Sequence, residues 1–301
     1  MPHPAVPSAS AALEADLDLA QRLADAADAI TLPAAARRDL AVDTKADRTW
    51  VTEADRAVEV GLRLLIAAER PGDGVLGEEG GETGGGPRRW ILDPIDGTAN
   101  FVRRVPVWAT LIALEDAGEL VLGVVSAPLL GRRWWAARGL GAWSAPLRPA
   151  GPVTSESRRL QVSSVDRLAD AHLSGCGDDG WEQLGLGPEV RELARRCWRE
   201  RAFGDFWSHV LVAEGACDIA LDPVVSAWDV AALVPIVEEA GGRTSDLAGN
   251  AGLEGGSAVS TNGLLHDQVL ELVGTGAARL GSSGRAPGGG ARHEVAGGSG
   301  R

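Results

Sequence analysis

Apolar residues recur at helical spacing in two stretches near the start of the chain. Over residues 11–30, leucines and alanines repeat in the pattern of an amphipathic helix. Over residues 53–69, the apolar side chains form a single stripe. Thr52 stands where a helix N-cap is needed, and Pro71 and Gly72 follow where that helix must end. Both stretches are therefore predicted to be helices that pack one face against a core.

Short apolar runs typical of strands come next. They span residues 90–92, 108–115, 120–126 and 133–137. Residues 116–119, Asp-Ala-Gly-Glu, join the second run to the third and predict a hairpin turn. The segment 80–87 is too rich in glycine for regular structure, so it is predicted to be a mobile loop.

The second half of the chain mixes helical and strand patterns. Helices are predicted over residues 188–199, 205–214, 227–240 and 263–273, and strands over 218–221 and 258–260. This order indicates a layered α/β fold. We expect one domain over residues 11–280, with a first half over about 11–150 and a second over about 151–280. Residues 1–10 and 281–301 hold too few periodic apolar side chains to fold and are predicted to be disordered tails.

Composition and charge narrow the range of partners. The apolar fraction, 45% of 301 residues, is that of an ordinary globular protein, and the net charge is −13. Nucleic acids and anionic membranes require basic patches, so neither is expected as a partner. The N-terminus lacks a basic region followed by an apolar stretch, and no run approaches the roughly 18 apolar residues of a membrane span. We therefore expect a cytoplasmic protein.

One segment, WILDPIDGTANF at residues 90–101, carries candidate chemistry. Its two aspartates, Asp93 and Asp96, repel each other unless a cation or a proton neutralises them. Hard divalent cations bind several oxygen ligands held close together. Gly97 permits a tight turn, and a helix or turn starting at Thr98 would direct backbone N–H groups at an anion. An ordinary Asp-Pro turn after a strand explains this segment equally well when it is considered alone.

Three further acidic residues lie at predicted strand ends or helix starts. Glu78 follows a short apolar run, Asp229 opens an apolar helix, and Asp55 lies in the first turn of the helix at 53–69. Each alone is typical of a solvated turn or a helix cap. Together they form the pattern of a site assembled at the ends of several elements.

Four blocks of the sequence resemble the inositol monophosphatase family. They are VTEAD at 51–55, GEEGG at 77–81, WILDPIDGTANF at 90–101 and WDVAALVPIVEEAGG at 228–242. The blocks stand in the family's order, and the resemblance covers about residues 11–275. It implies a layered α-β-α-β-α sandwich of the inositol-monophosphatase and fructose-bisphosphatase type. It also implies a Mg²⁺-dependent phosphatase with two or three ions per site, acting on a small phosphate monoester as a homodimer.

The resemblance also implies roles for single residues around the metal ions. The family's metal ligands correspond to Glu78, Asp93, Asp96, Asp229 and the backbone carbonyl of Ile95. Its water-activating pair corresponds to Asp55 and Thr98. No cysteine or histidine is required by this chemistry.

Other residues correspond to positions at which the family binds its substrate. Gly97 and Thr98 match backbone donors to the phosphate, and Lys45 matches a lysine near it. The family's contact to the rest of the substrate falls on Asp222, where glutamate is more usual, so the reach of this side chain is shorter. Asp205 is expected to contribute beside it.

Segments outside the metal site refine the expected substrate. Residues 123–143, 204–220 and 255–270 resemble the histidinol-phosphate phosphatases of actinobacterial histidine biosynthesis. This implies hydrolysis of L-histidinol phosphate to L-histidinol and phosphate by in-line attack of a metal-activated water. The alternative is an inositol monophosphatase or a phosphatase of broad specificity for sugar and polyol phosphates. A catalytically inactive relative that serves as a binding protein is disfavoured, because every matched metal and activator residue is present.

Overall fold

The computed structural model describes residues 9–45, 49–147, 156–175, 180–253 and 255–281. The helices within these ranges are α1 Ala9–Ala36, α2 Glu53–Glu69, α3 Thr98–Arg103, α4 Gly180–Gln183, α5 Gly187–Arg196, α6 Asp205–Ala213, α7 Ala227–Val230, α8 Leu233–Glu239 and α9 His266–Gly281, with a 3₁₀ turn at Leu168–Asp170. The predicted tails fall mainly on residues 1–8 and 282–301, which lie outside the described residues.

Two β-sheets organise the molecule. The larger sheet contains β3 Gly74–Gly77, β4 Gly81–Thr83, β5 Arg88–Asp96, β6 Ala109–Asp116, β7 Glu119–Ala127, β8 Arg132–Ala137, β9 Gly141–Pro146 and β10 Arg158–Arg159, in the order β10-β9-β8-β7-β6-β5-β3-β4. The smaller sheet contains β11 His172–Ser174, β12 Arg199–Glu200, β13 Ile219–Asp222, β14 Arg243–Ser245 and β15 Ala258–Thr261, in the order β12-β11-β13-β15-β14. A separate hairpin pairs β1 Val42–Thr44 with β2 Trp50–Thr52.

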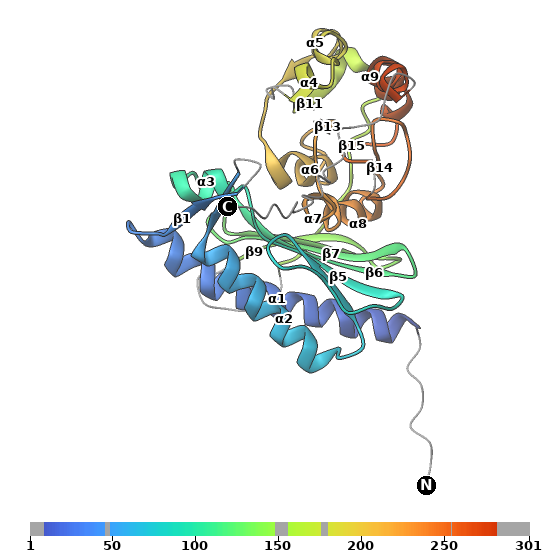
Figure 1. The fold of residues 1–301 in the computed structure, drawn as a ribbon. Helices are drawn as coiled ribbons and strands as arrows, with labels where there is room; N and C mark the ends of the chain where they lie inside the picture. Colours follow the sequence, from blue (N-terminus) through green and yellow to red (C-terminus); the bar gives the residue numbers. More distant parts are fainter. Residues whose placement is uncertain (1–8, 46–48, 148–155, 176–179, 254, 282–301) are drawn as a thin grey trace, which may run out of the picture.

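Helices and sheets alternate in five layers (Figure 1). Helices α1 and α2 cover one face of the larger sheet, and α8 packs on its other face, beside α6 and α7. The smaller sheet follows, in contact with α6 on one side and α9 on the other, where α9 packs against α5. The layered α-β-α-β-α sandwich expected from the sequence is confirmed.

Each interface between layers has its own apolar core. Leu23, Leu62 and Trp90 are fully buried between α1, α2 and the larger sheet. Phe206 and Ile236 belong to a second cluster that joins the other face of this sheet to α6 and α8. A third cluster lies beneath α5 and α9. Because burial of apolar surface is the dominant favourable term in folding, these clusters fix the positions of the elements that carry the site.

Several local predictions are confirmed to the residue. Helix α2 spans Glu53–Glu69, and Thr52 caps it in a reciprocal capping box with Asp55. The turn between β6 and β7 places Ala117 and Gly118 at φ of 53° and 83°, the left-handed pair that a tight hairpin requires. Helix α3 begins at Thr98, as expected for the turn after Gly97.

Other predictions need correction. Helix α1 starts at Ala9 and continues past residue 30 to Ala36. The extra turns pack Ala34 into a small cluster with Phe101 and Trp108, which local periodicity did not indicate. The glycine-rich segment is not entirely a loop, since Gly81–Thr83 forms β4 and pairs with β3. Backbone pairing needs no large side chains, so composition could not reveal this strand.

The helix predicted over residues 227–240 is broken in two. Helix α7 ends at Val230 and α8 begins at Leu233. Pro235 has no N–H with which to continue the hydrogen bonds of an unbroken helix. The break lies directly on the larger sheet: a Cβ atom added to Gly123 of β7 would lie 2.1 Å from the carbonyl oxygen of Ala232. Only glycine at position 123 allows this close approach.

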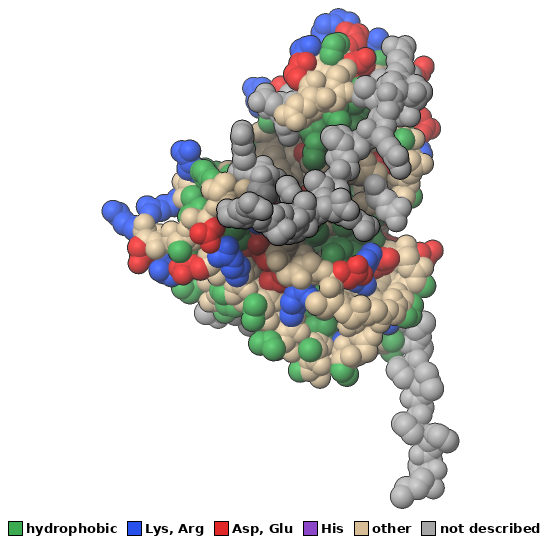
Figure 2. All heavy atoms as spheres, in the orientation of Figure 1, with side chains coloured by type: hydrophobic (Ala, Val, Ile, Leu, Met, Phe, Trp, Pro, Cys, Tyr) green, Lys and Arg blue, Asp and Glu red, His purple; other side chains and the backbone are tan. Residues whose placement is uncertain are grey.

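The surface mixes charges of both signs. On the face drawn in Figure 2, acidic and basic side chains lie beside one another rather than in separate patches. Exposed ion pairs such as Arg56 with Asp43, at 2.7 Å, account for part of this arrangement. None of the helices in the described ranges is long and apolar enough to cross a membrane.

Candidate active site

A β-bulge near the end of β5 determines the directions in which the side chains of two aspartates point. Along a regular strand, side chains alternate between faces, so residues three apart point to opposite sides of the sheet. Between Asp93 and Asp96 the register against β6 shifts, because Asp93 opposes Leu111 whereas Asp96 opposes Ala109. An extra residue of this kind changes the direction of the side chains that follow it. It allows both carboxylates to reach the same side.

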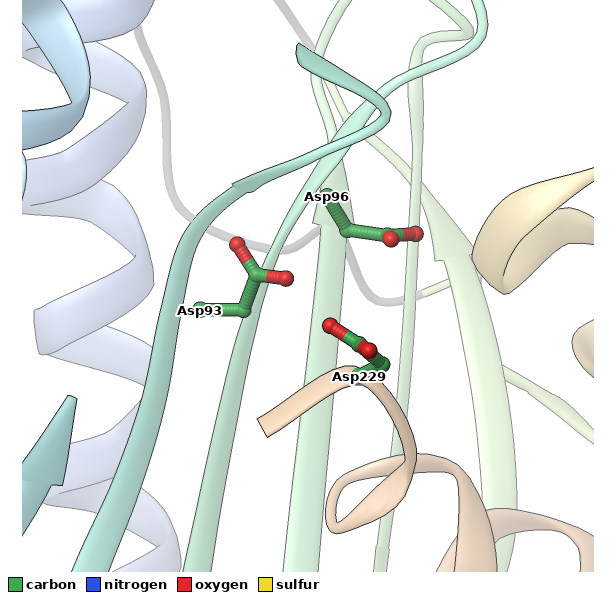
Figure 3. A group of neighbouring side chains, drawn as sticks. All are labelled: Asp93, Asp96 and Asp229. Atoms are coloured by element: carbon green, nitrogen blue, oxygen red, sulfur yellow. The ribbon is translucent and has the colours of Figure 1, made fainter. Parts of the chain in front are cut away.

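The third aspartate comes from the other half of the chain. Asp229 lies in α7, which packs against β5. One carboxylate oxygen from each of Asp93, Asp96 and Asp229 lies within 4.8 Å of the other two, and the side chains converge in Figure 3. Asp229 is also a helix-capping residue, since the backbone N–H of Ser226 donates to its Oδ2 at 2.7 Å. Capping holds this carboxylate beside the sheet.

Burial and mutual repulsion change the acidity of this cluster. Burial, followed by the charges of Glu78, Asp96 and Asp229, raises the pKa of Asp93 well above its ordinary value. Burial and the charge of Asp205 likewise raise the pKa of Asp96. Burial raises the pKa of Asp229 to about 6, although its capping bond opposes the shift. Among the described residues, no positive charge is a leading influence on the pKa of these three carboxyl groups.

The donor set fits a divalent cation. Asp93 is 2% exposed, and its Oδ1 has no hydrogen-bond partner among the described residues. A buried carboxylate oxygen without a partner is unfavourable. Carboxylate oxygens at this spacing are the ligands that hard cations such as Mg²⁺ take in proteins.

Asp55 and Thr98 lie beside the cluster and contact each other. The Thr98 hydroxyl is 3.4 Å from Asp55 Oδ1 and 2.9 Å from the carbonyl oxygen of Ile95. The other Asp55 oxygen accepts the capping hydrogen bond from the backbone N–H of Thr52 at 2.8 Å. Asp55 is 1% exposed, and burial raises its pKa to about 6. A carboxyl group with this pKa exchanges protons readily near neutral pH.

Lys45 is paired with two acidic residues at the edge of the site. Its Nζ lies 2.6 Å from Glu78 Oε1 and 2.6 Å from Glu79 Oε1. Burial alone would lower the pKa of Lys45, but the two carboxylates outweigh it and the pKa is raised. Glu78 is therefore held by Lys45 and lies outside the cluster of three aspartates.

Glu59, which the sequence reasoning did not single out, supports the turn that carries Glu78. Its carboxylate accepts hydrogen bonds from the backbone N–H groups of Glu79 at 2.7 Å and Gly80 at 2.8 Å. Arg63, one helical turn further on, donates to it at 2.8 Å. Glu59 is only 2% exposed. Its place within the apolar stripe of α2, four residues after Asp55, was the one available signal.

A pocket of about 320 Å³ opens over these groups. Its lining contains eight of the predicted site residues: Glu78, Asp93, Ile95, Asp96, Gly97, Thr98, Asp205 and Asp229. Thr49, Trp50 and Ala99 complete it. Lys45, Asp55 and Asp222 do not line the pocket, but Lys45 and Asp55 contact residues that do.

The start of α6 contributes further contacts to the pocket. The backbone N–H of Phe206 donates to Asp96 Oδ2 at 2.7 Å. Asp205, at a φ of 48°, adopts a left-handed conformation that is uncommon for a residue other than glycine. Its Oδ2 accepts from Asn100 Nδ2 at 3.0 Å. Burial and the charge of Asp222 raise the pKa of Asp205 to about 6. Asp205 lines the pocket, and Asp222 lies close enough for its charge to act on Asp205.

Comparison with known proteins identifies the family. A sequence model described as the inositol monophosphatase family matches residues 12–276. The chain belongs to the inositol monophosphatase family. The family predicted from the four sequence blocks is confirmed, and with it the class of enzyme, a phosphoric monoester hydrolase.

Members of the inositol monophosphatase family with similar sequences and folds are known. The chain is 56% identical over 262 residues to a histidinol-phosphatase from Mycobacterium tuberculosis, covering 87% of this chain and 98% of that protein. It is 49% identical to a histidinol-phosphatase from Streptomyces coelicolor, covering 85% and 95%. Among solved structures, an IMPase from Thermotoga maritima superposes with a TM-score of 0.76 at 29% identity, covering 88% of this chain and 99% of that one.

Proposed function

We propose that this member of the family hydrolyses L-histidinol phosphate to L-histidinol and phosphate with Mg²⁺ at the aspartate cluster. The observation that carries the chemistry is the convergence of Asp93, Asp96 and Asp229 from the two halves of the chain, next to the Asp55–Thr98 pair. The similarity to curated histidinol-phosphatases over nearly their whole length supports the choice of substrate.

The proposed metal ligands are the three aspartates, with Glu78 and the carbonyl oxygen of Ile95 completing the set for two or three ions. Mg²⁺ at this place would neutralise the carboxylates and withdraw charge from the phosphate ester. Lys45 is paired with Glu78 and Glu79, and it is proposed to approach the phosphate once Glu78 takes up a metal ion. Backbone N–H groups of Gly97 and Thr98 are proposed to contact the phosphate oxygens.

The proposed proton path runs through Thr98. Its hydroxyl passes a proton to Asp55 Oδ1, and the threonine oxygen takes a proton from the attacking water. The oxygen of the attacking water forms the new bond to phosphorus while the bond between phosphorus and the L-histidinol oxygen breaks. The leaving oxygen takes a proton from a solvent water and departs as an alcohol, and Asp55 then releases its proton to solvent. The raised pKa of Asp55 suits this role, because a proton acceptor works best with a pKa near the working pH.

The organic part of the substrate offers a positive charge. L-histidinol carries an ammonium group, whereas inositol offers only hydroxyl groups. Asp205 and Asp222 supply negative charge beyond the metal cluster, and the charge of Asp222 already raises the pKa of Asp205. The repulsion between two neighbouring carboxylates is relieved by a cation that lies between them.

We also propose, from the family resemblance, that the protein is a cytoplasmic homodimer.

A turnover comparison tests this proposal. The purified protein is assayed with histidinol phosphate, myo-inositol 1-phosphate and a nucleotide 3′-phosphate, each with Mg²⁺ and with EDTA. We expect the highest kcat/KM on histidinol phosphate and loss of turnover in EDTA. Equal or greater kcat/KM on myo-inositol 1-phosphate would assign the chain to the alternative, a phosphatase for polyol phosphates. Turnover that survives EDTA would contradict the metal-dependent mechanism.

A further inference from the structure

We propose that His209 is a positioning residue for substrate selection: it orients the carboxylate of Asp222, which pairs with the ammonium group of the substrate. This inference rests on the proposed function and adds a residue to it, since the sequence motifs of the metal site do not include His209.

The three residues involved come from neighbouring elements. His209 lies on α6, Asp222 ends β13, and Ser260 lies on β15, the antiparallel partner of β13. His209 Nε2 is 2.6 Å from Asp222 Oδ2, and His209 Nδ1 is 2.7 Å from Ser260 Oγ. Both ring nitrogens are therefore used, and the imidazole cannot turn without losing two hydrogen bonds.

The chemistry of the carboxylate fixes the direction of the bond to Nε2. An ionised carboxylate only accepts, so Nε2 must carry the proton that is donated to Asp222. The Ser260 hydroxyl can accept or donate, so it is a hydrogen-bond partner for Nδ1 in either case. Within the described residues Asp222 uses only Oδ2 in a hydrogen bond, so Oδ1 is left for a ligand.

Burial shows which end of this chain of hydrogen bonds faces the substrate. The side chain of His209 is 2% exposed and Ser260 is 3% exposed, whereas the Asp222 side chain is 27% exposed. A serine, a histidine and an aspartate also form the catalytic triad of hydrolases, where the serine attacks the substrate. Here the serine is buried and the aspartate is accessible, so the arrangement presents a carboxylate and not a nucleophile.

The position of Asp222 fits a contact to the part of the substrate beyond the phosphate. His209 follows Asp205 by four residues on α6, so both lie on the same face of that helix, and Asp205 lines the pocket. Asp222, bonded to His209, therefore lies on the side of α6 that faces the site. Residue Asp222 does not line the pocket over the metal ligands. A cationic group next to the leaving oxygen would lie between the cluster and Asp222.

Two substitutions at position 209 separate hydrogen bonding from packing. His209→Phe keeps a ring in the buried space but removes the donor to Asp222. His209→Gln places an amide N–H near the former Nε2 and should restore most of the affinity for histidinol phosphate that His209→Phe loses. Ser260→Ala removes the hydrogen-bond partner of Nδ1 and frees the ring to turn. His172→Phe, at the half-buried histidine of β11, is the matched control. Melting temperatures confirm that each variant is folded.

Both kcat and KM of each variant are measured on two substrates at saturating Mg²⁺. On histidinol phosphate we expect His209→Phe to raise KM about tenfold, the size expected for one charged hydrogen bond, with little change in kcat. On 4-nitrophenyl phosphate, which has no ammonium group, the loss should be less than about threefold. The double variant with Asp222→Asn should lose no more than Asp222→Asn alone, because His209 acts through Asp222.

The outcomes separate this inference from the proposed function. Three results would each overturn the role of His209 and leave the phosphatase assignment standing. They are equal losses on both substrates, additive losses in the double variant, and a KM of His209→Gln that stays as high as that of His209→Phe. Wild-type protein that hydrolyses 4-nitrophenyl phosphate but not histidinol phosphate would overturn both.

Discussion

Gly77 lies directly against the carboxylate of Glu59: a Cβ atom added to Gly77 would lie 2.4 Å from Glu59 Oε1. A Cβ atom added to Gly80 would lie nearly as close, at 2.6 Å from the same oxygen. The two glycines that flank Glu78 and Glu79 thus make room for a buried acid on α2. That acid in turn holds the backbone of the turn from which Glu78 reaches the site.

Replacing Glu59 by Gln should weaken metal binding. One of the two backbone N–H groups would then face an amide NH₂, which leaves a buried donor unpaired at a cost of about 1–3 kcal/mol. We expect a lower melting temperature and a Mg²⁺ requirement raised roughly tenfold, as the turn of Glu78 loosens. Titration of activity with Mg²⁺ measures this. Glu69→Gln, at an exposed acid of the same helix paired with Arg22, is the control. An unchanged Mg²⁺ titration would show that Glu59 serves only stability.

Asp96→Asn should abolish most turnover while it stabilises the metal-free protein. Asparagine keeps an oxygen that can accept the hydrogen bond from the Phe206 N–H, so the fold should persist. It removes one of the charges that repel one another in the cluster. We expect kcat to fall by several orders of magnitude and the melting temperature in EDTA to rise. Near-normal turnover at moderate Mg²⁺ would refute the metal-ligand role.

Thr98→Ala and Asp55→Asn should each lower turnover by about 10²–10⁴-fold, the range typical of a proton-transfer group. Because the two residues are proposed to act as one unit, the double variant should lose far less than the product of the single effects. Single-turnover rates of all three variants on one substrate decide this. Losses that multiply would mean that Thr98 and Asp55 work independently.

Because of His266, we expect the stability of the folded protein to depend on pH. Its ring nitrogens contact Ser245 and Thr261 at 2.9 and 3.0 Å, and burial lowers its pKa to about 4. In the unfolded chain a histidine has a pKa of about 6.5, so between these values the unfolded state binds more protons than the folded state. Stability contributed by His266 is therefore complete above pH of about 6.5 and is lost as the pH falls toward 4.

A difference measurement isolates this contribution of His266. Asp55 and Asp229, with pKa values raised to about 6, act in the opposite direction in the metal-free protein, because the folded state binds their protons more tightly. Urea unfolding of the wild type and of His266→Gln at pH 7 and pH 4.5 should show a smaller difference in stability between the two proteins at the lower pH. A difference that does not change with pH would rule out the titration of His266.

The sequence was sufficient where local chemistry determines structure. Helix α2 and its cap were predicted because the apolar stripe and Thr52 act over a few residues. The pattern of carboxylates at strand ends and helix starts indicated Asp93, Asp96 and Asp229 as members of one site, and the family resemblance added their proposed role as metal ligands; the structure brings the three together. The hydrogen bonds of Glu59 and His209 were not found, because their partners lie on other elements and only folding brings them together.

Structure also corrected predictions that depend on long-range packing. The bulge that turns Asp96 arises from the pairing of β5 with β6, for which the sequence of β5 alone gives no signal. The helical pattern over residues 227–240 is continuous in hydrophobicity, yet the chain breaks between α7 and α8. Pro235 was a local indication of this break. The contact with the larger sheet has no local indication in the sequence.

Gly123 also has a consequence for how the metal centre can be adjusted. Any other residue at this position would place a carbon atom 2.1 Å from the Ala232 oxygen, so the segment after α7 would have to move away from β7. Asp229 lies three residues before Ala232 and would be carried away from Asp93 and Asp96 on β5. The spacing of the three carboxylates is thus controlled in part by a residue outside the cluster. If these carboxylates bind the proposed metal ion, substitution at position 123 is expected to change which divalent cation supports activity.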